Sequence, residues 1–146
     1  MTEVLAVAAV LSCTLFTGAA IYINLVEHPA RLSCGTKIAS TQWKPSYERA
    51  TKMQASLAIV ATLAGLMLWF RGGGFLWLFG AGLIFLVIPF TLIVIRPTNT
   101  RLGRPDRDLE DAETRELLDR WGRLHAVRSG LGLVASVVYV RAMSGT

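Results

Sequence analysis

Two histidines occur in the chain, and each falls in a stripe of polar residues at the edge of an apolar stretch. The first stripe occupies positions i, i+3, i+4 and i+7 of a helix and consists of Asn24, Glu27, His28 and Arg31. A histidine can act as a general base near neutral pH, and a neighbouring carboxamide or guanidinium can hold the anion that forms in a low-dielectric pocket. Proton abstraction is therefore one chemistry that this stripe suggests.

The second histidine lies in a stripe formed by Trp121, His125 and Arg128. Arg128 is surrounded by apolar sequence, and an ionisable group at such a depth normally faces the interior of a bundle and pairs with another charge. We predict Glu27 as its partner. The interpretation that Glu27 and Arg128 form a purely structural ion pair stays open beside a role in a site.

A metal or a haem would use the same residues. His28, His125 and Glu27 are sufficient ligands for a two-histidine, one-carboxylate iron site or a similar zinc site. Glu27 and His28 are adjacent, however, and point about 100° apart on a helix, so they would not easily share one ion. Paired haem ligation by His28 and His125 is geometrically open across a bundle. From the sequence the cofactor is unknown, with none, a metal and a haem all open.

Further polar residues gather where the matching ends of other helices are expected. The catalytic candidates are His28, His125 and Arg128. The candidates for substrate binding are Asn24, Glu27, Tyr47, Gln54, Asn99 and Trp121. We expect other basic residues at these helix ends to be solvated or to snorkel, namely Arg31, Lys44, Lys52, Arg115, Arg120 and Arg123.

The elements that position these residues are predicted from hydropathy. Hydrophobic residues make up 53% of the chain and charged residues 17%, a balance outside the soluble range. About 20 apolar residues cross a bilayer, and a water-soluble bundle would need a polar stripe along each helix, which two of the stretches lack. The prediction is an all-α, integral membrane four-helix up-and-down bundle. It is a single transmembrane domain, 1–146, with helices at about 3–28, 46–70, 75–96 and 113–141.

Prolines and glycines predict where these helices end. Pro29 predicts the end of the first helix, because proline disfavours helical geometry in the residue before it. Pro45 or Ser46 is the expected start of the second helix, with Trp43 and Tyr47 at headgroup depth as an aromatic belt. An Arg-Gly-Gly-Gly run at 71–74 then reverses the chain, so the second and third helices form an antiparallel hairpin.

The distribution of basic residues predicts the orientation. Of the 15 lysines and arginines, twelve fall in the two connections after the first and third helices, and only Arg71 and Arg141 lie on the other side. This positive-inside bias predicts cytoplasmic basic loops and both termini outside, in a bacterial-type inner or plasma membrane. Topology explains the net charge, so we expect contacts with membrane lipids and no nucleic acid as a partner.

At these same polar residues the sequence resembles the anthrone oxygenase-like integral membrane family, whose bacterial members mostly have no assigned function. The resemblance rests on five motifs, which are 24–32 (NLVEHPARL), 43–54 with WKPSYERA and Met53-Gln54, 89–91 (PFT), 97–99 (PTN) and 121–129 (WGRLHAVRS). It spans nearly the whole chain and implies the four-helix membrane fold.

The resemblance also implies a reaction, because fungal members are similar to enzymes that oxidise anthrones to anthraquinones with molecular oxygen. It points to Asn24, His28, Asn99, His125 and Arg128. In the implied mechanism His28 or His125 takes a proton from a phenol or an activated methylene carbon. Arg128 and Asn99 then hold the enolate while dioxygen oxidises the carbanion.

Two functions therefore stay open. The first is a membrane oxygenase or oxidoreductase acting on a lipophilic phenolic or anthrone-like aromatic, in a pocket at the cytoplasmic end of the bundle. The alternative is a non-catalytic membrane protein that binds a lipid, haem or quinone-like ligand. A transporter would need paired broken helices or assembly into a homo-oligomer, since four spans give a poor path in a monomer. In each case the partner is a lipophilic small molecule.

Overall fold

The computed structural model describes residues 1–145, and all regular structure in that range is helical. The elements in chain order are α1 (Thr2–Tyr22), the π-helical η1 (Ile23–Glu27), α2 (His28–Ser33), α3 (Thr36–Phe70), α4 (Phe75–Phe90), the π-helical η2 (Thr91–Ile95), α5 (Arg96–Leu102) and α6 (Ala112–Ser144). Adjoining elements join into four continuous helices, Thr2–Ser33, Thr36–Phe70, Phe75–Leu102 and Ala112–Ser144. Each is long and apolar enough to span a membrane, which confirms the predicted four-helix membrane fold.

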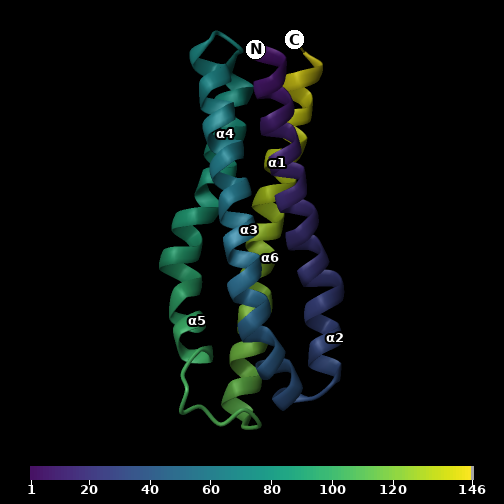
Figure 1. Cartoon of the computed structure of the whole chain (residues 1–146), viewed down its shortest axis with the longest axis vertical. Helices are drawn as coiled ribbons and strands as arrows, with labels where there is room; N and C mark the ends of the chain where they lie inside the picture. Colours follow the sequence, from purple (N-terminus) through teal and green to yellow (C-terminus); the bar gives the residue numbers. More distant parts are fainter. Residues whose placement is uncertain (146) are drawn as a thin grey trace.

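The four helices run up and down in chain order (Figure 1). α1 packs against α3 and α6, and α4 packs against the same two helices, so α3 and α6 lie diagonally opposite each other with few contacts. Both termini lie at one end of the bundle (Figure 1). The two connections rich in basic residues lie at the other end. Polar side chains before and after these connections are thereby brought to one end of the molecule.

The second helix begins ten residues before the predicted start, because the sequence analysis wrongly treated Pro45 as a boundary. α3 begins at Thr36, after Gly35 with φ of 91°, and contains Pro45 in its interior. The lost backbone hydrogen bond is tolerated because Ala39 and Trp43 are fully buried in this first part of the helix. Trp43 therefore packs inside the bundle, and its position at headgroup depth stays a prediction.

The first and third helices also continue past their predicted ends, through Pro29 and Pro97. Each proline stands two residues after a π-helical segment, η1 or η2. Proline cannot donate to the carbonyl four residues earlier and its ring crowds that carbonyl, which here lies inside the π-helical turn. The wider turn accommodates the proline without ending the helix, and such turns are frequent at functional sites.

At the end of the bundle that holds the termini, the core is mostly apolar and combines many alanines with a few large side chains, among them Phe16, Trp77 and Tyr139. The ring of Tyr139 fits between Gly65 and Gly80, and its hydroxyl donates to the carbonyl of Ala61 at 2.8 Å. A Cβ on Gly80 would lie 2.6 Å from this ring. The histidines and the other candidate site residues lie at the opposite end of the bundle.

At that opposite end, α6 begins with a capped turn. The Asp111 carboxylate accepts a hydrogen bond from the backbone N–H of Thr114 at 2.6 Å. Hydrogen bonding by Thr114 holds the pKa of Asp111 below its usual range. The cap fixes the start of the helix on which Trp121, His125 and Arg128 are spaced.

Candidate functional site

Asn24 is the centre of a hydrogen-bond network between η1 and α6. Its Nδ2 donates to the carbonyl of Gly122 at 3.0 Å, which fixes the orientation of the carboxamide because a carbonyl can only accept. Its Oδ1 is thereby directed at α6 and accepts from Ser129 Oγ at 2.6 Å. The same Oδ1 lies 2.8 Å from Nδ1 of His125.

This network selects the tautomer of His125. Because Asn24 Oδ1 is an acceptor, Nδ1 of the ring must carry a proton, and in the neutral imidazole Nε2 then holds the lone pair. His125 is 1% exposed and lines an internal cavity. The arrangement therefore presents a buried histidine whose Nε2 holds the lone pair.

Arg128 lies one turn further along α6 and is 7% exposed. Its Nη2 donates to Gln54 Oε1 at 2.8 Å, and its Cζ lies 5.7 Å from the centroid of the Phe16 ring. Within residues 1–145 no carboxylate forms an ion pair with it. The predicted pairing of Arg128 with Glu27 is therefore wrong.

Glu27 instead binds Arg31, one turn away on the same helix. The Glu27 carboxylate also accepts from Ser46 Oγ at 2.5 Å and from Gln42 Nε2 at 2.9 Å. Arg31 is only 6% exposed, which corrects the prediction that it is solvated. The sequence did not indicate this cluster, because Gln42 falls in the part of α3 that was expected to be a loop.

His28 occupies a different environment from His125. Its Nε2 lies 3.0 Å from the carbonyl of Leu118, and its Nδ1 is buried without a partner. The ring packs against Trp121, with 5.1 Å between centroids, and lies over Gly122. His28 does not line the cavity that His125 faces. Trp121 links the two histidines, because its ring also stacks on His125 at 4.8 Å.

α3 and α5 meet through a hydrogen bond between Tyr47 and Asn99. Asn99 Nδ2 donates to the Tyr47 hydroxyl at 3.0 Å, while Asn99 Oδ1 is buried without a partner. Tyr47 stacks on Trp43 with 5.0 Å between ring centroids and lines the cavity. Asn99 thus contacts the cavity through Tyr47 and does not line it.

The cavity has a volume of only about 10 Å³, close to the minimum for one water molecule. Its lining residues are Ile23, Arg31, Ser46, Tyr47, Ala50, Thr51, Gln54, Trp121, His125 and Arg128. Several buried donors in this lining have no hydrogen-bond partner, namely Arg31 Nε and Nη1, Gln54 Nε2 and Arg128 Nε. Buried donors without partners are costly, and all of these would be satisfied by an oxygen-rich ligand.

The predicted metal candidates are not brought together. The described part of the chain holds no group of three or more His, Cys, Asp or Glu side chains that could bind a metal ion. The Glu27 carboxylate is bound to Arg31, Ser46 and Gln42, and binding of an iron by His28 Nε2 would break its contact with Leu118. Of the catalytic candidates, His125 and Arg128 share the cavity.

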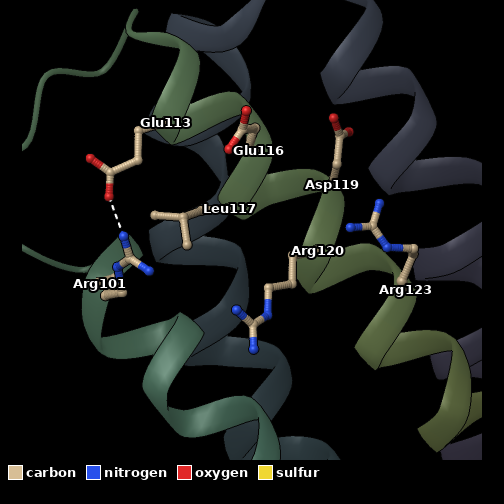
Figure 2. Close-up of a pocket in the computed structure, with 7 residues that line it drawn as sticks. All are labelled: Arg101, Glu113, Glu116, Leu117, Asp119, Arg120 and Arg123. Carbon is tan, nitrogen blue, oxygen red and sulfur yellow. Dashed lines mark hydrogen bonds and ion pairs between the residues drawn. The ribbon is translucent and has the colours of Figure 1, made fainter.

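A second, open pocket of about 310 Å³ lies on the surface beyond this site, between α5 and α6 (Figure 2). It is lined by Arg101, Glu113, Glu116, Leu117, Asp119, Arg120 and Arg123. Arg101 forms an ion pair with Glu113, and Arg120 and Arg123 are exposed, as predicted for solvated helix ends. Acidic and basic side chains line this pocket together and are exposed to solvent. Ion pairs between exposed side chains contribute little to stability.

Comparison with known proteins identifies the family. The anthrone oxygenase family model matches residues 43–138, a segment that contains Tyr47, Gln54, His125 and Arg128. Anthrone oxygenase tpcL of Aspergillus fumigatus is 30% identical to the chain, over an alignment that covers 91% of the chain and 89% of that protein. No solved structure matches the chain. The protein is a four-helix membrane protein that belongs to the anthrone oxygenase family.

Proposed function

We propose that the protein oxidises a lipophilic phenolic or anthrone-like aromatic with dioxygen, at the cavity lined by His125, Arg128 and Tyr47, which must enlarge to admit such a substrate. One observation supports this most strongly. A buried guanidinium without a carboxylate partner lines the same cavity as a histidine whose basic nitrogen is fixed by Asn24. Such a pair can remove a proton from carbon and stabilise the anion that results.

In the proposed reaction His125 Nε2 takes one proton from the methylene carbon of the anthrone. The negative charge moves to the ketone oxygen, where Arg128 and Gln54 donate hydrogen bonds to the enolate. Dioxygen takes up the electrons of the carbanion, and a carbon–oxygen bond forms to give a hydroperoxide, whose oxygen receives the proton held by His125. The second hydrogen on that carbon is lost as the oxygen–oxygen bond breaks. One oxygen atom becomes the new quinone carbonyl and the other leaves as water.

Other residues of the cluster position the reactants. Trp121 stacks on His125 and lines the cavity, so its ring holds the plane of the imidazole and forms an apolar wall beside it. The Tyr47 hydroxyl, held by Asn99, can contact a phenolic oxygen of the substrate. We assign to His28 the positioning of Trp121 and keep the base function for His125, because only His125 lines the cavity. Glu27 acts through Arg31, whose free Nε and Nη1 face the same cluster.

We place the site on the cytoplasmic side of the membrane as part of the proposal. The site lies at the end of the bundle where the two basic connections lie, and such connections are retained in the cytoplasm. The substrate class is consistent with this depth, because a tricyclic ketone partitions into the bilayer and its oxygens favour the interfacial region.

The alternative function, non-catalytic binding of a lipid or quinone-like ligand, rests on the same unpartnered donors. Gln54 Nε2 and Arg128 Nε can donate to a quinone carbonyl as well as to an enolate. A protein that only binds its ligand would not need the lone pair that Asn24 places on Nε2 of His125. Conversion of a bound anthrone therefore separates the two functions.

The experiment is the reaction itself, with purified protein in lipid nanodiscs, a hydroxylated anthrone and isotopically labelled dioxygen. The proposal predicts enzymatic quinone formation above the spontaneous rate, with one labelled oxygen atom in each quinone. A double His28→Ala, His125→Ala variant should fall to the spontaneous rate. Unchanged turnover by a folded double variant would remove both histidines from the mechanism.

A further inference from the structure

A groove between α3 and the α4–η2 helix ends at the functional site. It has a volume of about 110 Å³. Its lining residues are Thr51, Gln54, Ala55, Ala58, Val87, Ile88, Thr91, Leu92 and Arg128. Most of these are apolar, and Ala55 and Leu92 are exposed on the outside of the bundle. The groove therefore opens on a surface of the helices that faces lipid.

Three residues, Thr51, Gln54 and Arg128, line both the groove and the closed cavity. Gln54 is 1% exposed and donates nothing through its Nε2, and Arg128 donates nothing through its Nε. The bond between Arg128 Nη2 and Gln54 Oε1 joins the two side chains where the spaces adjoin. The inner end of an apolar groove thus carries two buried donors without acceptors.

This combination matches a particular kind of ligand. Apolar walls bind a flat hydrocarbon part, while donors at the inner end bind a carbonyl or phenolate oxygen at its leading edge. A ligand with its oxygens distributed around the ring would bury some of them against Val87 and Ile88 without partners, which is unfavourable.

We propose that this groove is the entrance subsite for the lipophilic substrate, which passes from the bilayer between α3 and α4–η2 with its oxygen edge first. The oxygen first binds Arg128 Nε and Gln54 Nε2. Separation of Arg128 from Gln54 then joins the groove to the cavity that His125 lines. The inference rests on the proposed function for its substrate class.

The groove must widen to admit a tricyclic ligand, since drug-sized ligands occupy pockets of roughly 300–1,000 Å³. One of its walls contains the π-helical η2, where Thr91 donates its hydroxyl to the carbonyl of Val87 at 2.7 Å. A π-helical turn interrupts the regular α-helical hydrogen-bond pattern, and such turns are frequent at functional sites. We therefore assign the widening to the wall contributed by η2.

The test fills the groove and measures binding. Wild-type protein and an Ala55→Phe variant are placed in lipid nanodiscs and titrated in the absence of dioxygen with an anthrone whose hydroxyls flank its single ketone. The absorbance of this ligand reports binding without turnover. Ser56→Phe is the matched control, because Ser56 is the next residue on α3, is exposed and does not line the groove. We expect Ala55→Phe to weaken binding by roughly tenfold or more and Ser56→Phe by less than about twofold.

The opposite wall provides an independent pair of variants. Ile88→Trp fills the groove from α4, and Leu86→Trp adds the same side chain to an exposed position outside it. If Ala55→Phe does not fold, this pair gives the same comparison. Equal binding by groove and control variants, or no binding by the wild type, would overturn the entrance.

The outcome separates the entrance from the reaction. If the wild type forms the quinone and both groove variants bind the ligand as well as the wild type does, only the entrance proposal is contradicted. Binding that depends on the groove in a protein that never oxidises an anthrone supports the entrance and defeats the proposed oxygenase function.

Discussion

Asn24 Oδ1 lies 2.8 Å from His125 Nδ1, although the two residues are 101 positions apart in the chain. The contact joins the π-helical η1 to the middle of α6. Because the carbonyl of Gly122 fixes the Asn24 carboxamide, the contact also decides which nitrogen of His125 is basic. The packing of the first helix on the last therefore brings together the two residues to which we assign the positioning role and the role of base.

Replacement of Asn24 by leucine should make His125 a poorer base, although the imidazole itself is kept. His125 would lose the acceptor that holds the proton on Nδ1, so both tautomers would be populated. We expect kcat to fall by a large part of the ~100- to 10,000-fold that a positioned base contributes, with a small change in KM. Nitrogen NMR of the His125 ring should show the mixed tautomers.

Ser129→Ala is the control for this change, because it removes the other donor to Asn24 Oδ1 and leaves the contact with His125. Its kcat should stay close to that of the wild type. An Asn24→Leu protein with a normal kcat and a single tautomer would contradict the role given to Asn24.

The lone charge of Arg128 should lower the stability of the unliganded protein. A buried cation without a carboxylate partner is costly, and replacing buried charges with apolar groups is often stabilising by about 1–4 kcal/mol. Arg128→Met alone would leave Gln54 Oε1 without a donor, at a cost of about 1–3 kcal/mol. The double variant Arg128→Met, Gln54→Leu should therefore unfold at a higher temperature than the wild type while losing turnover. A double variant that is much less stable than the wild type would show that the pair is structural.

Gly122 should tolerate no side chain, because a Cβ there would lie 2.7 Å from Nε2 and Cδ2 of His28. Gly122→Ala should displace the His28 ring from the Leu118 carbonyl and destabilise the fold by about 1–3 kcal/mol, as overpacking does. Gly130→Ala on the same helix meets no atom within 4 Å and should stabilise by up to about 1 kcal/mol through helix propensity. Thermal unfolding in detergent measures both. Equal effects of the two substitutions would mean that the contact with His28 is relieved without cost.

Double-mutant cycles distinguish the observed partner of Glu27 from the one predicted by the sequence. Glu27 and Arg31 are in contact, so Glu27→Gln and Arg31→Gln should couple by about 0.5–3 kcal/mol. Glu27→Gln and Arg128→Gln should be nearly additive, because the structure places the two residues in separate hydrogen-bond networks. Strong coupling between Glu27 and Arg128, with none between Glu27 and Arg31, would instead support the ion pair predicted from the sequence.

The sequence predicted the number of helices, their order and the end of the bundle that is polar, since these depend on hydropathy and chain reversal. It misplaced the start of α3 because Pro45 is compatible with a helix whose flanks are buried, and burial of Ala39 and Trp43 cannot be read from local sequence. The partner of Glu27 was missed for a related reason. Gln42 and Ser46 reach it only because α3 extends to Thr36. Polar residue types indicated the site, and tertiary contacts determined which of them share a cavity.

Proton abstraction by His125 is the central claim, and it can be measured apart from the oxygen chemistry. The measurement follows exchange of the methylene protons of a hydroxylated anthrone in deuterated buffer without dioxygen, for the wild type, His125→Gln and His28→Gln. We predict exchange above the buffer rate with the wild type and with His28→Gln, and exchange at the buffer rate with His125→Gln. Undiminished exchange with a folded His125→Gln protein, or a loss confined to His28→Gln, would contradict the account.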